Sequence, residues 1–226
     1  MNVPDISRAA AGFAPLEQLA QALLPYVADD AGDGSHDLAH LLRVWRNALR
    51  LLEQEGGEPR ILLAAVLLHD CVRVEKNSPL RSQASALSAR RSLEILREQG
   101  WPAHEADAVA HAVEAHSFSA GIAPRSVEAK IMQDADRLDA IGAIGVARCF
   151  YTAGRMGSQL YDAADPQARA RALDDRRYAL DHFPAKLFTL SAGFQTAAGA
   201  AMAREREERM RRFVGEMMAE LQAPRD

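Results

Sequence analysis

An uninterrupted apolar segment that ends in two ionisable residues is the strongest constraint on the fold of this chain. The seven residues from Leu62 to Leu68 are all apolar, and His69 and Asp70 follow them directly. Pro59 suits the first turn of a helix, so we expect a buried helix from about residue 59 to residue 72. An imidazole and a carboxylate at the rim of a core are costly unless something compensates them, and a metal ion would do so.

Helical periodicity recurs along the rest of the chain. Apolar residues repeat at helical spacing, alanine, leucine, arginine and glutamate are abundant, and aromatic and β-branched residues are few. We therefore predict an all-α fold, with residues 1–14 as a loose leader and residues 15–226 as a single compact helical domain. Further helices are expected over residues 16–27, 36–54, 82–99, 102–116, 126–152, 166–182 and 195–221. The last two of these are additional C-terminal helices, within about residues 166–222.

Charge and cysteine content exclude several classes of protein. The formal net charge of −4 offers no basic surface for a nucleic-acid polymer or an anionic membrane. Two cysteines do not indicate a disulfide framework, and we expect reduced thiols. No segment approaches the roughly 18 apolar residues of a membrane span, and no signal peptide is evident. We expect a cytoplasmic protein, monomeric or homodimeric.

Imidazole and carboxylate side chains at three separated places form a candidate metal site. These residues are His40, the adjacent pair His69 and Asp70, and Asp136, each on a different predicted helix. Two imidazoles and two carboxylates make a mixed nitrogen and oxygen set that suits one divalent metal ion.

The three motifs resemble those of the HD-domain metal-dependent phosphohydrolases, whose signature is a His, then a His-Asp doublet, then a later Asp, all on helices. The resemblance covers about residues 20–150. Residues 75–79, 116–119 and 134–142 are also similar to one bacterial subgroup of small, stand-alone HD hydrolases. Members of that subgroup look like nucleotide phosphohydrolases, and some cleave triphosphates with release of pyrophosphate. The resemblance implies an HD-type helical bundle that acts on a small phosphorylated substrate.

For the metal, the family motif favours Asp136 as the last ligand over Asp134 and Asp139. The implied cofactor is one divalent ion, with Mn²⁺ as the first candidate and Fe, Co, Ni, Zn or Mg as alternatives. Asp70 is expected to bind the ion and to hold the attacking water, whose pKa the metal lowers so that hydroxide is available near neutral pH.

Cationic side chains are needed to stabilise the charge that develops on a phosphoryl group. Lys76 and Arg81 flank an irregular segment just after the His-Asp doublet, so we expect them to bind phosphate. Arg137 either contacts the substrate or braces a carboxylate.

Two further histidines are candidates for the same site. His36 shares a helix face with His40 and either contacts the substrate or caps the helix. His116 lies in one of the subgroup segments and is expected to be a substrate contact or a general acid, with a structural helix-end histidine as the alternative.

Two departures from related enzymes and three alternative functions stay open. The close pair His111 and His116 differs from the widely spaced extra histidines of dinuclear HD enzymes, which favours a mononuclear site. No Glu stands directly after the doublet as a general acid or base, so the mechanism depends on the metal-bound water and Asp70. The alternative functions are an alarmone hydrolase, a nucleoside monophosphate phosphatase, and a non-catalytic module that senses nucleotide or metal.

Overall fold

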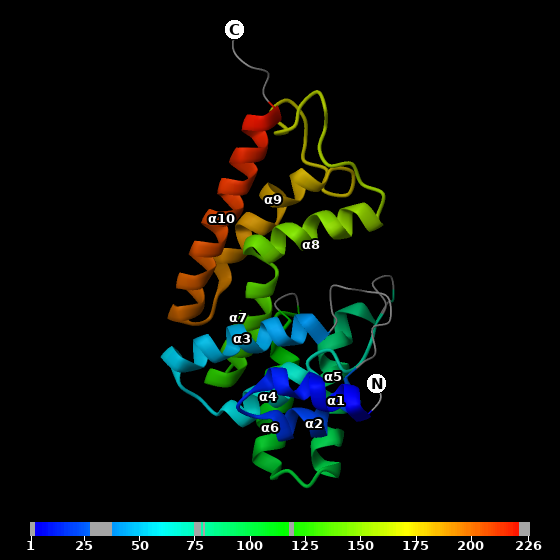
Figure 1. Ribbon diagram of the computed structural model, residues 1–226, viewed down its shortest axis with the longest axis vertical. Helices are drawn as coiled ribbons and strands as arrows, with labels where there is room; N and C mark the ends of the chain where they lie inside the picture. The colour runs from blue at the N-terminus through cyan, green and yellow to red at the C-terminus, as the bar shows by residue number, and fades with distance from the viewer. Residues whose placement is uncertain (1–2, 28–37, 75–77, 79, 118–119, 222–226) are drawn as a thin grey trace. The chain divides into compact units, whose positions relative to one another are not determined.

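The computed structural model describes residues 3–27, 38–74, 78, 80–117 and 120–221 (Figure 1). Within these ranges the regular structure is helical, and a single bridge between Gln159 and Tyr178 is the only β-type pairing, so the predicted all-α class is confirmed. No helix in these ranges combines the length and apolar character that a membrane crossing requires. The chain divides into two compact units, residues 1–136 and 137–226, and the expected single domain stays a prediction.

The first unit is a bundle of helices around α4. Its elements are α1 (Val3–Ala10), η1 (Ala11–Phe13), α2 (Glu17–Leu23), η2 (Leu24–Tyr26), α3 (Leu38–Glu55), α4 (Pro59–Leu68), η3 (Arg81–Gln83), α5 (Ala84–Glu98), α6 (Ala103–Ala115) and most of α7 (Val127–Asp139). Helix α4 contacts α2, α3, α5 and α6.

The apolar segment of α4 forms the centre of this bundle, as the sequence predicts. Every residue from Leu62 to Leu68 is at most 1% exposed. The helix begins at Pro59, with the Glu58 side chain accepting a hydrogen bond from the Arg60 amide at 3.2 Å. It ends at Leu68 rather than near residue 72, so the His-Asp doublet stands at the helix C-terminus.

The expected loose leader is wrong for residues 3–13, which form α1 and η1. The Phe13 side chain is completely buried, and the Trp45 indole Nε1 on α3 donates a hydrogen bond to the Ala14 carbonyl at 3.1 Å. Ala9, Ala10 and Phe13 are buried, so the segment packs on the first unit through an apolar face.

The second unit contains α8 (Gly142–Arg155), η5 (Ala179–Asp181), α9 (His182–Ala185), η6 (Leu187–Gly193) and α10 (Ala197–Leu221). Aromatic rings from three of these elements pack together, with centroids of Phe150, Phe183 and Phe213 5.9–6.2 Å apart. The expected continuous helix over residues 126–152 is instead two helices, α7 and α8. Gly142 has a φ of +77° at the junction, a conformation that interrupts an α-helix and that glycine adopts without strain.

The helix predicted over residues 166–182 is absent, and the segment up to Tyr178 is irregular. The Asp165 side chain accepts hydrogen bonds from the amides of Arg169 and Ala170 at 2.9 and 2.8 Å. Arg171 donates to the buried carboxylate of Asp181 at 2.5 and 2.9 Å. These side-chain bonds replace the backbone ladder that a helix would supply.

Phe13 should contribute strongly to stability if the N-terminal segment is part of the core. We expect Phe13→Ala to lower the free energy of unfolding by about 3–5 kcal/mol, because the substitution removes a buried ring and leaves a cavity. Urea unfolding would measure the change, with Leu80→Ala at an exposed side chain as the control. Equal stabilities of Phe13→Ala and wild type would show that the segment is loose after all.

Asp181 should make the second unit sensitive to acid. Burial raises the pKa of Asp181, but Arg171 and the Asp174 amide outweigh burial and hold the pKa below its usual value. The resulting stabilisation is present above about pH 4 and is lost as the pH falls through the lowered pKa. Asp181→Asn should therefore be less stable than wild type at pH 7, and the difference should narrow in acid. Thermal unfolding of wild type and Asp181→Asn between pH 2.5 and 7 would measure this difference, with Asp107→Asn at an exposed carboxylate as the control. A difference in stability that does not change with pH would show that Asp181 is not ionised.

Candidate metal centre

His69 closes the C-terminus of α4 with its own side chain. The Nδ1 atom of its buried ring donates a hydrogen bond to the Val66 carbonyl at 2.8 Å, which is one of the carbonyls that the last helical turn leaves without a backbone partner. Because Nδ1 is the donor, the lone pair of Nε2 is available to a ligand. The local structure of the helix end therefore fixes both the tautomer and the direction of the imidazole.

His116 repeats this arrangement at the C-terminus of α6. Its Nδ1 donates to the Val113 carbonyl at 2.6 Å, and its Nε2 is likewise left as an acceptor. The two rings meet edge to face, with centroids 4.9 Å apart. A Val-x-x-His segment thus ends both helices and directs two imidazole Nε2 atoms into one site.

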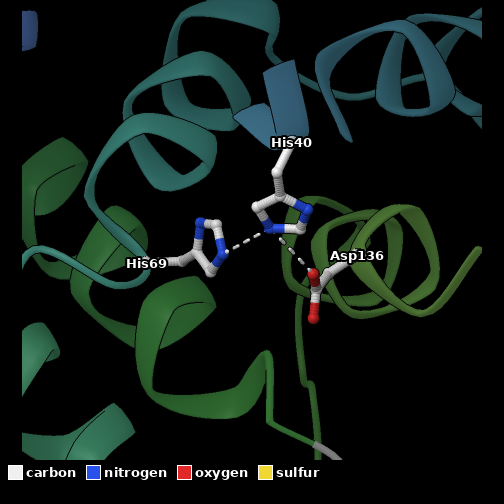
Figure 2. A group of neighbouring side chains, drawn as sticks. All are labelled: His40, His69 and Asp136. Carbon is white, nitrogen blue, oxygen red and sulfur yellow. Dashed lines mark hydrogen bonds and ion pairs between the residues drawn. The ribbon is translucent and has the colours of Figure 1, made fainter. Parts of the chain in front are cut away.

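His40 and Asp136 bring α3 and α7 to the same place (Figure 2). The Nε2 atom of His40 lies 3.4 Å from Nε2 of His69 and 3.4 Å from Oδ1 of Asp136. Both histidines are 1% exposed, whereas the Asp136 side chain is 31% exposed. The three side chains form a group that could hold a metal ion.

Asp70 joins a second group of the same kind. Its Oδ2 lies 3.5 Å from Nε2 of His69, and its Oδ1 lies 3.8 Å from Nε2 of His116. The ligand-type atoms of His69, Asp70 and His116 all lie within 4.8 Å of one another, as do those of His40, His69 and Asp136. His69 belongs to both groups, and the half-exposed carboxylate of Asp70 is the member most open to solvent.

The residues fit a divalent cation. Ligand atoms about 2.1 Å from one ion lie roughly 3.0–3.4 Å apart in octahedral or tetrahedral geometry. The distances of 3.4 Å from His40 to His69 and to Asp136 match this range. Nitrogen and carboxylate ligands together suit Mn, Fe, Co, Ni or Zn better than Ca or Mg.

The pKa values of the two helix-end imidazoles shift in opposite directions. Burial lowers the pKa of His69, but Asp70, Asp136 and the hydrogen bond to Val66 outweigh burial, so the pKa lies above its ordinary value. Burial, followed by the neighbouring His69, lowers the pKa of His116 below its ordinary value against the pull of both carboxylates. The carboxylates therefore favour positive charge at His69, a field that also suits a metal cation.

The three candidate aspartates on α7 have different surroundings. Asp136 faces His40, while Asp139 is buried and accepts a hydrogen bond from Arg148 Nη1 at 2.6 Å. Asp134 is completely buried. Among the described residues, Asp136 is the α7 carboxylate that falls in a metal-capable group, as the family motif suggested.

The expected substrate contacts are placed only in part. His36 and Lys76 lie outside the described residues, and of Arg81 only the backbone, in η3, is described. Arg137 Nη1 donates to the Gly193 carbonyl at 3.0 Å, and its guanidinium lies over the Phe194 ring. The roles of all four in substrate binding stay predictions.

Buried polar residues that the sequence did not single out support the helix ends. Ser92 Oγ donates to the Ser88 carbonyl at 2.7 Å and lies 3.5 Å from the Leu68 carbonyl, and Ser88 Oγ accepts from the Val72 amide at 3.3 Å, so α5 contacts the segment at the end of α4. Both serines are completely buried. Their i, i+4 spacing on an otherwise amphipathic helix is the signal that could have revealed them.

Comparison with known proteins gives a consistent result. Residues 37–141 match the family model of the HD domain. The Bacillus subtilis protein YpgQ is 34% identical over 186 residues, which is 80% of this chain and 82% of the relative.

Solved structures of similar proteins have the same fold. The structure of B. subtilis YpgQ in complex with ADP matches with a TM-score of 0.68 at 30% identity, and the match covers 96% of this chain and 97% of the YpgQ chain. A Bacillus thuringiensis HD-superfamily hydrolase has a TM-score of 0.69 at 31% identity and covers 90% of this chain and 96% of its own.

Metal content tests the ligand set directly. Protein purified in chelator-free buffer should contain close to one equivalent of a divalent transition metal. Asp136→Ala should weaken metal binding at least about 10-fold, because it removes one ligand from the group. The control is Asp107→Ala, the same change at an exposed carboxylate of α6. Plasma emission analysis would contradict the site if the wild type bound no metal under any condition.

Proposed function

Since this chain belongs to the HD-domain superfamily of metal-dependent phosphohydrolases, we propose that it hydrolyses a nucleoside triphosphate to the monophosphate and pyrophosphate. The half-exposed Asp70 carboxylate between His69 and His116 is the observation that carries the proposal. It sets an acceptor for a water proton beside a group of side chains that could hold a metal. The ADP in the structure of YpgQ supports a nucleotide as the ligand.

In this proposal His40, His69, Asp70 and Asp136 hold one divalent ion, with Mn²⁺ as the first candidate. A bound ion would polarise the phosphoryl oxygens and lower the pKa of a water molecule. The second group, which contains His116, leaves that histidine for proton transfer rather than for a second ion.

Asp70 orients the attacking water and accepts its proton as the new oxygen–phosphorus bond forms at the α-phosphorus. His116 is suited to relay that proton, because its lowered pKa keeps Nε2 neutral and its Nε2 faces Asp70 Oδ1 at 3.8 Å. The proton then passes to the bridging oxygen as the bond between the α-phosphorus and that oxygen breaks. The products are the nucleoside monophosphate and pyrophosphate.

The phosphates need cationic partners, and the proposal assigns Lys76, Arg81, His36 and Arg137 to them by likeness to the family. The substrate is a small molecule and not a nucleic-acid polymer, in keeping with the negative net charge of −4. We also propose a cytoplasmic enzyme, which agrees with the free thiols of Cys71 and Cys149.

Chromatography of reaction products tests the proposal. The protein would be incubated with Mn²⁺ and a panel of nucleoside tri-, di- and monophosphates and a guanosine tetraphosphate-type alarmone. We expect monophosphate and pyrophosphate from a triphosphate. Asp70→Ala should reduce the rate at least about 100-fold, because it removes the proton acceptor, whereas Asp107→Ala should not.

Other products would replace the proposal with a specific alternative. Orthophosphate from monophosphates would identify a nucleotidase, and cleavage of the tetraphosphate alone would identify an alarmone hydrolase. Bound metal without turnover of any compound in the panel would favour a sensing module.

A further inference from the structure

Two buried amide side chains hold the backbone immediately before two of the site residues. Asn47 Nδ2, on α3, donates a hydrogen bond to the Ala135 carbonyl at 3.0 Å, and the next residue is Asp136. Asn47 also lies seven residues after His40, which places both on one face of α3. Asn47 therefore ties α3 to α7 beside the two residues, His40 and Asp136, that these helices contribute to the candidate metal group.

Gln133 makes the corresponding bond between α7 and α6. Its Nε2 donates to the Ala115 carbonyl at 2.7 Å, and the next residue is His116. Ala115 is the last residue of α6, so its carbonyl has no partner within the helix, and the Gln133 side chain supplies one. This hydrogen bond ties the peptide group between Ala115 and His116 to α7.

Neither amide belongs to the chemistry itself. Asn47 and Gln133 are 5% and 3% exposed, and both side chains are uncharged. The second polar atom of Gln133, Oε1, is buried and has no hydrogen-bond partner among the described residues. A buried acceptor left unsatisfied is costly, so the side chain is poorly suited to a purely packing role.

We propose that Asn47 and Gln133 are positioning residues with separate tasks, Asn47 setting the metal-binding carboxylate of Asp136 and Gln133 setting His116. This inference rests on the proposed function, because it assigns metal binding to Asp136 and proton transfer to His116. The separation follows from the two carbonyls that the amides hold, which precede different residues on different helices.

The proposal gives two variants with opposite signatures. Asn47→Leu should weaken Mn²⁺ binding about 10-fold and leave kcat at saturating Mn²⁺ within about threefold of wild type, because only a ligand is displaced. Gln133→Met should leave Mn²⁺ binding within about twofold and lower kcat about 10- to 100-fold, since a displacement near 1 Å suffices to misalign a proton-transfer group. A role in general stability would move both quantities together in both variants.

The measurements are titration calorimetry of Mn²⁺ without substrate and steady-state kinetics with the triphosphate that the wild type cleaves. Gln54→Met, at an exposed side chain of α3, is the control for both. Asn47→Ala and Gln133→Leu, which also lose the amide donor and add no charge, replace Asn47→Leu and Gln133→Met if those variants fail to unfold cooperatively on heating. At pH 8 we again expect Asn47→Leu to change mainly Mn²⁺ binding and Gln133→Met to change mainly kcat.

The outcomes separate this inference from the proposed function. Wild type that binds no Mn²⁺ overturns the metal site and this inference with it. Wild type that binds Mn²⁺ and shows equal changes in the two variants, or none, overturns this inference alone. If the wild type binds Mn²⁺ without turnover, the proposed function fails and the role given to Gln133 is overturned with it. The role given to Asn47 is then overturned as well unless calorimetry shows weaker Mn²⁺ binding in Asn47→Leu.

Discussion

The hydrogen bond from the His69 ring to the Val66 carbonyl is the interaction on which the site depends. A helix as apolar as α4 can be buried along its length, but its last carbonyls still need donors. His69 supplies one donor from its own side chain. Because the ring satisfies the helix with one nitrogen, it presents the other to the cluster. The residue that closes the core helix is thus also the one that offers a nitrogen atom to the cluster.

Apolar pattern made much of the first unit predictable. The buried segment of α4, the helical class and the convergence of His40, His69, Asp70 and Asp136 all follow from apolar spacing and from the resemblance of the motifs to one family. The segment from Leu62 to Leu68 is apolar on every side, so it is stable as a helix only where all of its faces are buried. The choice of Asp136 among three aspartates did not follow from spacing, and only the family motif pointed to it.

Contacts between residues distant in sequence account for what the pattern did not reveal. The N-terminal segment is ordered because Phe13 is buried in the first unit, a long-range contact that the local sequence does not reveal. The helix expected after Asp165 is absent because carboxylates take up the backbone amides, and such bonds look like caps in a sequence. The sequence does not reveal the roles of Asn47 and Gln133, since each role is defined by a carbonyl on another helix.

The paired Val-x-x-His helix ends have a consequence for the apo protein. Each ring has its tautomer and its rotamer selected by its own helix, so the conformational entropy of these two side chains is lost when the first unit folds. Preorganisation of this kind distinguishes the site from small zinc domains that fold only around their metal. The two imidazoles are therefore already ordered in the folded first unit, and a ligand that binds them does not have to order them.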